Sequence, residues 1–495
     1  MVGDNLLRIE AKELGADTSK TNFSIFPKWN EIVSPKLQGY LAGKDNVHVL
    51  TKGHDLNFEG KPAKELDITT QATHFAVQPI NFLGMSPIPK VVVEKGDEVK
   101  AGDLLFFDKK RPEIKYVAPV SGEIVAVNRG EKRSIKEVII LADKEMQYRS
   151  FETFDYASEP REKLVEYLLE AGIWPLIRQR PYDIVPGIAD EPKNIFISTF
   201  DSAPLAPDLS FVVGDQKVAF QKGLDVLSKL TPGKVYLGLD GRGEAPSTVF
   251  SEAAGVEKHY FAGPHPSGNV GVQIHHVNPI NASDKVWTLG VQEVLTIGKL
   301  FTEGKYDAKR IVAITGGEVS KPRYVQTYLG VSFESLLKNE LKSEHVRLIS
   351  GDVLSGEAKG MDGFLNFLDD QITVIKEGDQ HELFGWLLPL KPRPSISKTF
   401  PNFLFRDLEF EANTNTHGEK RAFVVTGQYE KVLPMDILPQ HLMKSILVND
   451  YESMEGLGIY ELSEEDIALC EFVCTSKQPL QSILREGLEM MREQG

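Results

Sequence analysis

The feature that most constrains the fold is a series of short apolar stretches between Val47 and Glu145, separated from one another by glycine, proline or aspartate. At its centre lies VEKGDEVKAGDLLFFDKKRPEIKYVAPVSGEIVAV, which runs from Val93 to Val127. Alternating apolar and polar residues between closely spaced turn residues are typical of strands joined by hairpins. The pattern therefore predicts a compact all-β unit in this part of the chain.

The two halves of this stretch mirror each other as the halves of lipoyl and biotinyl carrier domains do. The first half follows the pattern GDxVxxGDxL and the second follows APxxGxI. The matching residues are Gly96, Asp97, Val99, Gly102, Leu104, Ala118, Pro119, Gly122 and Ile124. Asp108 and Lys109 also resemble the Asp-Lys pair of lipoyl domains. The resemblance raises the question whether Lys109 carries lipoate or biotin.

We expect that no lysine of this stretch is modified. Carrier domains place the target lysine eight residues before the proline of the returning Ala-Pro pair, but Lys109 lies ten residues before Pro119. Pro112 fixes its own φ and restricts Arg111, which stiffens the longer loop. The count predicts that Lys109 and Lys110 do not form an exposed two-residue tip. Biotinyl domains also flank the lysine with methionines, and this stretch has none.

Length and charge limit what the chain can be. With 495 residues it is expected to form about three or four domains. Its 41% hydrophobic and 26% charged residues are ordinary for a globular protein and argue against a largely disordered chain. The net charge of −15 disfavours binding to nucleic acid or to anionic lipid, because both carry phosphate charge.

The sequence predicts a cytosolic protein. No apolar run approaches the roughly 20 residues that cross a bilayer, and the N-terminal MVGDNLLRIEAKELG has acidic residues where a signal peptide has its apolar core. Two cysteines fit a reducing compartment and give no disulfide framework. We expect any association with a membrane to occur through protein partners.

The pattern of apolar residues changes after the all-β unit. REKLVEYLLEAGIW has apolar residues at helical spacing, and NIFISTF and KVYLGL have the pattern of buried strands, which together predict an α/β layer. VQEVLTIGKLFTEGKY predicts a closing helix that ends near Gly304. KRIVAITGGEVSKPRYVQTYLGVSFESLL then predicts strand, turn, strand and helix, and HVRLISGDVLSG and DQITVIKEG predict further strands.

The last part of the chain is predicted to be loop-rich and then helical, with LKPRPSISKTFPNF and EANTNTHGEK as surface loops. The fold class is therefore a multidomain mixture of α+β and α/β units. The predicted organisation is an N-terminal arm over 1–46, an all-β unit over 47–144, an α/β domain over 145–305, a small α+β unit over 306–390 and a C-terminal domain over 391–495.

Two glycine-rich stretches fail as nucleotide-binding motifs. GLDGRG, from Gly238 to Gly243, follows a predicted strand but lacks the G-x-G-x-x-G spacing that lets the backbone approach a pyrophosphate. GDVLSGEA, from Gly351, has Glu357 and Ala358 where a phosphate loop needs lysine and a hydroxyl residue.

The cysteines and histidines give no clear metal site. Cys470 and Cys474 follow the helix-start signature of Ser463 and Asp466 and are interpreted as small apolar residues of a helix interface. An iron–sulfur cluster usually needs four thiolates. The histidines cluster at positions 259, 265, 275 and 276. Metal binding there stays open, but core or solvated histidines are favoured, since His275 and His276 would point to opposite faces of a strand.

A family resemblance rests on several segments in one order. GPHPSGNVGVQIHHVNPI resembles the GPHPxGxxGxxIHxxxPI segment of the NqrA family, the A subunits of the bacterial Na⁺-translocating NADH:quinone oxidoreductase. IRQRPYDIVP, ITGGEVSKPRYVQTYLGVSFESLL, LISGDVLSG, VIKEGDQHELFGWL, NTNTHGE and GQYEKVLPMDILP are similar to other segments of that family. The similarity runs from about residue 47 to the C-terminus and leaves only the N-terminal arm outside.

The resemblance implies a barrel-sandwich hybrid domain, a domain like the flavin- and NADH-binding subunit of respiratory complex I, a β-grasp domain and a helical C-terminal region. It also implies a peripheral subunit on the cytoplasmic side of the bacterial inner membrane, docked on integral membrane subunits of a sodium pump that couples NADH oxidation to quinone reduction. On this interpretation the flavins, iron and NADH site belong to other subunits, and this chain binds no cofactor and has no catalytic residue.

The chain departs from the complex I and Rnf relatives at a glycine-rich loop. Where those proteins have a loop of the kind GGAGFPT, AGIWPLIRQRPYD offers Gly172 alone, followed by Trp174 and Pro175. Bulky side chains would occupy the phosphate space, and Pro175 lacks an amide hydrogen to donate. This argues against the alternative that the chain is an Rnf-type subunit that binds NADH and flavin. A further alternative to the assembly subunit is a lipoyl or biotinyl carrier protein.

Three residues are candidates for contacts with quinone or with another subunit of the complex. A quinone site needs an apolar slot and one or two donors for the carbonyl oxygens. Arg180 and Tyr182 in RQRPYD and His265 in FAGPHPSG can supply such donors. The alternative is that these residues order loops or face a neighbouring subunit.

Overall fold

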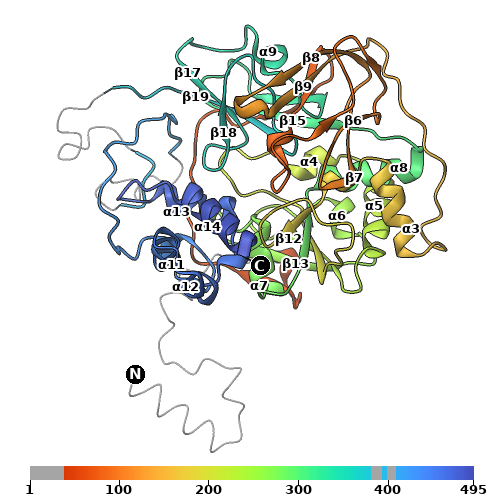
Figure 1. Ribbon diagram of the computed structural model, residues 1–495. Coiled ribbons are helices and arrows are strands. Elements are labelled where there is room, and N and C mark those ends of the chain that lie inside the picture. Colours follow the sequence, from red (N-terminus) through yellow and green to blue (C-terminus); the bar gives the residue numbers. More distant parts are fainter. Residues whose placement is uncertain (1–37, 381–392, 398–407, 495) are drawn as a thin grey trace, which may run out of the picture. The chain divides into compact units, whose positions relative to one another are not determined.

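The computed structural model describes residues 38–380, 393–397 and 408–494. Contacts within the chain divide it into Met1–Gly43 and Lys44–Gly495, and the described part of the first unit contains the short 3₁₀ helix η1 (Gly39–Leu41). The sheets formed by the described residues all lie in the second unit and have six, six, four and three strands. Figure 1 shows their order along the chain.

The all-β part of the second unit is formed by two antiparallel sheets. The four-stranded sheet has the order β3 (His74–Val77), β9 (Ile135–Ala142), β8 (Gly122–Arg129), β5 (Glu98–Val99). The three-stranded sheet has the order β4 (Lys90–Val91), β6 (Leu104–Asp108), β7 (Arg111–Val117). The 3₁₀ helices η2 (Pro79–Asn81) and η3 (Glu131–Arg133) lie in loops of this all-β part. The hairpins predicted from the glycine pattern are confirmed.

The turn that joins β6 to β7 differs from the turn predicted for Lys109 and Lys110. Asp108 pairs with Arg111, so Lys109 and Lys110 are the two exposed residues at the tip of the hairpin. The prediction that they do not form such a tip is wrong. The count back from Pro119 failed because register shifts between Leu104 and Asp108 change how the two arms align.

The second part of the chain forms a six-stranded sheet with helices around it. Its order is β1 (Val47–Val49), β13 (Glu257–Ala262), β12 (Val235–Asp240), β11 (Asn194–Ser198), β14 (Val286–Leu289), β10 (Arg178–Arg180). All neighbours are parallel except β10 and β14. The helices are α3 (Arg161–Glu170), α4 (Leu209–Val213), α5 (Lys217–Ser228), α6 (Thr248–Ser251), α7 (Val270–Val277) and α8 (Val291–Glu303), with the 3₁₀ helix η4 (Trp174–Leu176).

The predicted strands NIFISTF and KVYLGL and the closing helix are confirmed, and Gly304 ends α8 with a left-handed φ of 66°. Helices α5 and α8 approach each other through glycines. A methyl group on Gly223 would lie 2.2 Å from the carbonyl oxygen of Val294, and one on Gly298 would lie 1.8 Å from that of Ala219. Only glycine permits this separation of the two helices.

A second six-stranded sheet follows. Its order is β18 (Glu357–Lys359), β17 (Val346–Ser350), β19 (Gln371–Lys376), β15 (Lys309–Thr315), β16 (Arg323–Tyr328), β2 (Ala63–Asp67), and α9 (Phe333–Leu337) follows β16. The predicted order of strand, turn, strand and helix is confirmed. The short strands β1 and β2 precede the hairpins in sequence, yet each is an edge strand of a different six-stranded sheet.

The C-terminal part is a group of helices with its own apolar core. They are α10 (Tyr429–Val432), α11 (Pro439–Leu447), α12 (Tyr451–Gly456), η6 (Ile459–Glu461), α13 (Glu464–Phe472) and α14 (Leu480–Gln494). Ser463 and Asp466 form the predicted capping box of α13. Cys470 and Cys474 are buried in the core, as predicted. EANTNTHGEK contains no helix or strand, and LKPRPSISKTFPNF lies mostly outside the described residues.

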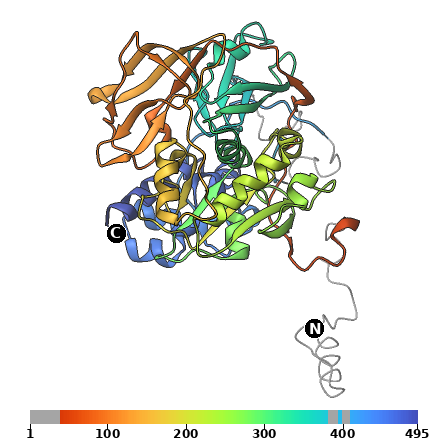
Figure 2. The ribbon, with the colours of Figure 1, turned by 90° about the vertical axis from the view of Figure 1, so that its right-hand side faces the viewer.

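Figure 2 shows the all-β sheets beside the second six-stranded sheet on one side, and the α/β layer beside the C-terminal helices on the other. The buried salt bridge between Arg310 and Glu293, 2.6 Å long, joins β15 to α8 across two of these parts. Among the helices that the structure describes, none combines the length and apolar character of a membrane span.

Candidate functional site: a cavity at the junction of the domains

The RQRPYD segment joins the α/β layer to the C-terminal helices. Arg180 ends the edge strand β10 and is 2% exposed. Its Nη1 donates to the Asp466 carboxylate over 3.1 Å and its Nη2 to that of Glu465 over 2.8 Å. Asp183 lies 3.5 Å from its Nε. Three carboxylates therefore engage Arg180, and its guanidinium is used within the protein.

Tyr182 belongs to the same junction. Its backbone carbonyl accepts a 2.9 Å hydrogen bond from Nη1 of Arg485 in α14, and its ring packs edge-on against Tyr460. Burial, followed by the interaction with Tyr460, raises the pKa of the Tyr182 hydroxyl to about 12. Arg485 also donates to Glu464 over 2.6 Å. The aromatic pair, this hydrogen bond and the Arg485–Glu464 ion pair hold η6, α13 and α14 against the segment that follows β10.

His265 lies in the loop between β13 and α7. It is 3% exposed. Its backbone N–H donates to Asp55 over 2.8 Å, and its Nδ1 lies 3.0 Å from Oγ of Ser202. Nε2 is buried and has no hydrogen-bond partner among the described residues. Burial lowers the pKa of His265, so the ring is neutral near pH 7.

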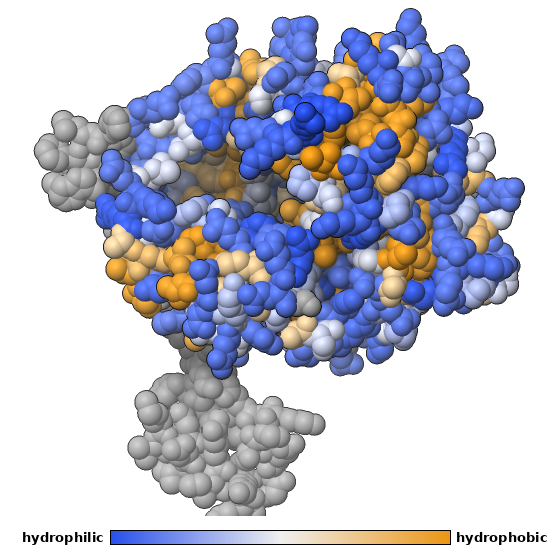
Figure 3. Space-filling view, viewed as in Figure 1, coloured by the Kyte–Doolittle hydropathy of each residue, from blue (hydrophilic) through white to orange (hydrophobic). Residues whose placement is uncertain are grey.

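His265 lines a cavity of about 560 Å³ to which all four parts of the second unit contribute. The all-β part supplies Ile80, the α/β layer Asp201, the second sheet Asp352 and the C-terminal helices Glu465. The surface in Figure 3 is hollowed between the second sheet and the C-terminal helices. The carboxylates of the wall are Asp183, Asp201, Asp352, Glu357, Asp369, Asp370, Glu464 and Glu465.

The structure brings the three predicted residues together only in part. His265 belongs to the cavity wall, whereas Arg180 and Tyr182 are not among its lining residues. Sequence reasoning missed the carboxylates. The signal available for them was the Asp369–Asp370 pair directly before the buried strand β19, a position where a strand end can present polar side chains to a cavity.

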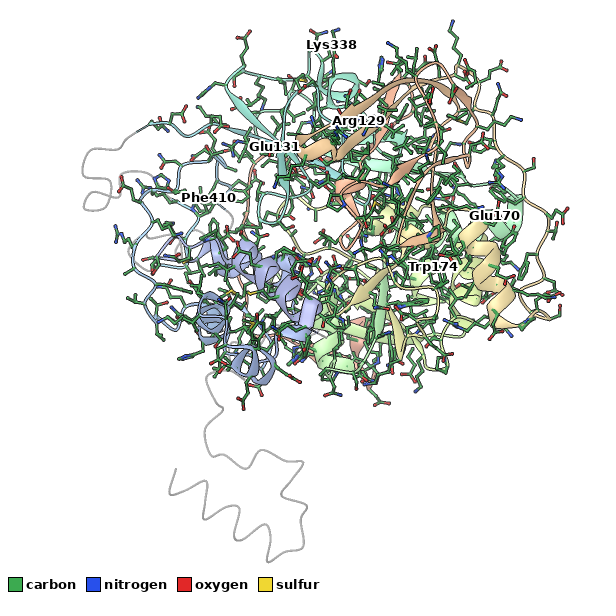
Figure 4. The ribbon with its side chains drawn as sticks, in the orientation of Figure 1. Arg129, Glu131, Glu170, Trp174, Lys338 and Phe410 are labelled. Atoms are coloured by element: carbon green, nitrogen blue, oxygen red, sulfur yellow. The ribbon has the colours of Figure 1, made fainter. Side chains whose placement is uncertain are left out.

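The loop AGIWPLIRQRPYD, which lacks a glycine-rich phosphate loop, is filled by side chains. Trp174 is fully buried, donates from Nε1 to the Pro186 carbonyl over 2.9 Å and packs edge-on against Trp287. Figure 4 shows Trp174 beyond the end of α3, which carries Glu170. A methyl group on Gly172 would meet Val117 at 2.5 Å. The residues present do not fit a flavin or nicotinamide phosphate in this loop.

The histidine cluster is divided between a strand, a loop and a helix, with His259 in β13 and His265 in the loop that follows it. His275 and His276 lie in α7, so the prediction that they point to opposite faces of a strand is wrong. Nδ1 of His275 contacts Glu461 over 2.7 Å, and Nε2 of His276 contacts the Pro434 carbonyl over 2.8 Å. Within residues 38–380, 393–397 and 408–494, no three His, Cys, Asp or Glu side chains are placed to hold a metal ion.

The comparisons with known proteins identify the parts of the fold. Residues 48–143 match the model described as the NqrA N-terminal barrel-sandwich hybrid domain, and residues 159–306 match the NqrA second alpha/beta domain. Residues 311–359 match the model described as the NQRA C-terminal domain. These matches confirm the predicted fold class.

Curated relatives match over most of the chain. The A subunit of the Na(+)-translocating NADH-quinone reductase of Hahella chejuensis is 41% identical over 449 residues, which are 90% of this chain and 99% of the relative. The protein of the same name from Vibrio atlanticus is 38% identical over the same shares. A solved NAD⁺-reducing [NiFe]-hydrogenase covers 68% of this chain and 69% of its own at 11% identity and a TM-score of 0.35, too low to support an argument.

Proposed function

Because the chain belongs to the NqrA family, the A subunits of the Na⁺-translocating NADH-quinone reductase, we propose that it is a subunit of such a complex, which couples NADH oxidation and quinone reduction to sodium export. The match to relatives of that name covers nearly their whole length. The predicted resemblance to the family is thereby confirmed.

Within this complex we propose a peripheral subunit on the cytoplasmic side, held by integral membrane subunits and itself free of flavin, iron and NADH. The observation that supports the absence of a flavin is the buried Trp174. Its indole fills the loop where flavin-binding relatives keep glycines. Two cysteines in the whole sequence are also too few for the usual four-thiolate cluster. The role is then assembly: the chain positions neighbouring subunits through a rigid set of packed domains.

The other functions predicted from sequence receive less support. An Rnf-type electron-entry subunit needs the glycine loop that Trp174 replaces. It remains a prediction that Arg180, Tyr182 and His265 contact quinone or another subunit. Arg180 is buried among carboxylates, and the cavity beside His265 has an acidic wall, which suits an apolar quinone ring poorly.

Two measurements test the proposal. The purified full-length chain should show no stoichiometric flavin or iron–sulfur absorption, whereas such bands would contradict the cofactor-free role. In cells that lack the integral subunits, the chain should shift from the membrane to the soluble fraction. Retention on protein-free liposomes of anionic lipid at ordinary salt would contradict docking through partners.

A further inference from the structure

Two hairpins of the all-β part end in basic tips. Lys109 and Lys110 form the tip between β6 and β7, and Lys132 and Arg133 form the tip between β8 and β9, where Arg129 ends β8. All five residues are exposed, and none forms an ion pair with a carboxylate of the described residues. Figure 4 labels Arg129 at the end of the second hairpin.

The tips lie in the part of the chain that is not acidic. Residues 47–144 contain 15 Lys and Arg and 14 Asp and Glu, whereas the whole chain contains 56 and 71. The excess of negative charge therefore lies outside the all-β part. Because salt screens charges over about 8 Å, a small group that approaches the tips senses their positive charge more strongly than the net charge of the chain.

The bases of the two tips contact consecutive residues of one segment. Asp108, at the base of the first tip, accepts from the Ser86 N–H over 3.4 Å. Ile135, which begins β9 at the base of the second tip, donates its N–H to the Pro87 carbonyl over 3.3 Å. Ile88 follows these two residues and is 40% exposed. The two tips thus start from one place on the surface, with an apolar side chain beside them.

Asp108 holds the first tip in one conformation. It is 1% exposed, and its Oδ1 accepts the Lys110 N–H over 3.0 Å. Nε of Arg111 lies 3.8 Å from Oδ2 of the same carboxylate. The buried carboxylate therefore orders the turn that carries Lys109 and Lys110 before any partner arrives, which reduces the conformational entropy lost on binding.

The second tip keeps two basic residues in a strained turn. The Ser134 N–H donates to the Glu131 carbonyl over 3.0 Å, and Lys132 and Arg133 between them have left-handed φ values of 51° and 64°. A hairpin turn with two left-handed residues favours Asn-Gly, because other side chains adopt this conformation with strain. The stability of the turn does not explain the Lys-Arg pair, which indicates a role for these side chains in contacts outside the chain.

Building on the proposed function as a subunit of a larger complex, we propose that the two tips form one docking surface for an acidic segment of a neighbouring subunit. A single exposed ion pair contributes little to affinity. Several basic side chains on ordered turns can engage successive carboxylates of one segment and so determine which segment binds. The exposed Ile88 offers the same segment an apolar contact.

A protein segment fits this surface better than a layer of anionic lipid. Lipid headgroups cover an area much larger than the two tips, so the acidic remainder of the chain, whose net charge is −15, opposes that contact. Glu131 is also exposed within the second tip. It would repel a dense layer of phosphates, whereas a protein segment can place a donor opposite it.

Zero-length cross-linking of the purified native complex tests the contact directly. A carbodiimide joins a lysine Nζ to a carboxyl carbon where the two already touch, and the displaced carboxyl oxygen leaves in the urea by-product. Lys109, Lys110 or Lys132 should form such amides with Asp or Glu of another subunit, which mass spectrometry identifies. Equal acetylation of these lysines in the isolated chain and in the complex, without any cross-link, would overturn the proposal.

Binding assays measure how much the tips contribute. The purified full-length chain is added to membranes that hold the other subunits but lack this chain. Lys109→Gln with Lys132→Gln, the tip variant, should weaken binding roughly tenfold or more, because two charges leave the surface. Lys217→Gln with Lys229→Gln, on exposed residues in and after α5, changes the net charge equally and should alter the affinity by less than about twofold.

A change in the second turn separates binding from folding. Lys132→Asn with Arg133→Gly introduces the preferred turn pair, so the isolated chain should unfold at the wild-type temperature or above it. The same variant should bind the membranes more weakly than the wild type, because both basic side chains are gone. Binding as tight as that of the wild type would overturn the role of the second tip.

Three outcomes show what has failed. If the wild-type chain does not bind membranes that hold the other subunits, the proposed function fails and the docking surface fails with it. If the wild type and the tip variant bind these membranes equally, the docking surface alone fails. Binding of the wild type to protein-free vesicles of anionic lipid, lost in the tip variant, would assign the tips to lipid and overturn the acidic segment.

Discussion

Arg180 and Asp466 form a buried ion pair between the edge strand of the α/β layer and the first turn of a C-terminal helix. Nη1 of Arg180 lies 3.1 Å from Oδ2 of Asp466, and the side chain of Asp466 has no exposed surface. The same Oδ2 accepts the backbone N–H of Ser463 over 2.9 Å, which completes the capping box of α13. One carboxylate thus serves both a helix start and a domain junction.

Arg180→Gln should therefore destabilise the protein by about 3 kcal/mol, because it leaves Asp466 buried without its cationic partner. Urea unfolding followed by circular dichroism measures the change. Arg129→Gln, on an exposed residue of β8, is the matched control and should have an effect below about 0.5 kcal/mol. Equal stability of the two variants would show that the ion pair does not hold the junction.

The close approach of α5 and α8 predicts an effect of a single methyl group. Gly298→Ala should destabilise the protein by about 1 to 3 kcal/mol, because the new methyl would meet the Ala219 carbonyl oxygen. Gly456→Ala in α12 meets nothing within 4 Å and should be neutral or stabilising by up to about 1 kcal/mol. Thermal unfolding of both variants checks the difference, and a neutral Gly298→Ala would contradict it.

A histidine pair at the edge of the α/β sheet predicts acid sensitivity. Nε2 of His48 in β1 lies 3.0 Å from Nδ1 of His259 in β13. Burial, then the charges of His259 and His276, lower the pKa of His48 from 6.5 to about 4. The folded state thus disfavours the protonated form, so this contribution to stability is complete above pH 6.5 and is lost as the pH falls towards 4.

Between about pH 7.5 and about pH 5.5, His48→Gln should remove about 1 kcal/mol of the acid-induced loss of stability, a value reduced to allow for the partial exposure of His48. Urea unfolding at both pH values measures it. If the wild type and the variant lose stability in parallel, His48 is not the titrating group.

Lys109 and Lys110 are accessible at the tip of their hairpin, so the structure does not by itself exclude their modification. We still predict that neither lysine carries lipoate or biotin, since no methionine flanks them and the returning arm is two residues longer than in carrier domains. Intact-mass measurement on protein from its native host should equal the sequence mass. A lipoyl- or biotin-sized increment that disappears in Lys109→Arg would refute this.

Elements with a strong local period could be predicted from the sequence. The period of α8, the alternation of the all-β hairpins and the capping box at Ser463 all depend on residues close together in the chain. The tip at Lys109 was missed because a β-bulge changes the register of a hairpin without a distinct residue pattern.

The cavity could not be predicted, because its wall is assembled from segments far apart in the sequence. Asp201 and Asp352 each sit in a turn of their own, and Asp-rich turns are common on protein surfaces. Of the predicted site residues, His265 reaches the wall, whereas Nη1 and Nη2 of Arg180 donate to Asp466 and Glu465. Donor type can be read from sequence, but whether a donor is already satisfied depends on tertiary contacts.

The pairing of β1 with β13 has a consequence for synthesis on the ribosome. His48 precedes His259 by 211 residues. At ordinary elongation rates this corresponds to about 10 to 40 s between the emergence of the two strands. During that time Val47–Val49 has no partner in its sheet, and the same holds for β2 until β16 appears. The nascent chain must therefore keep two short strands unpaired while the hairpins that follow them can already fold.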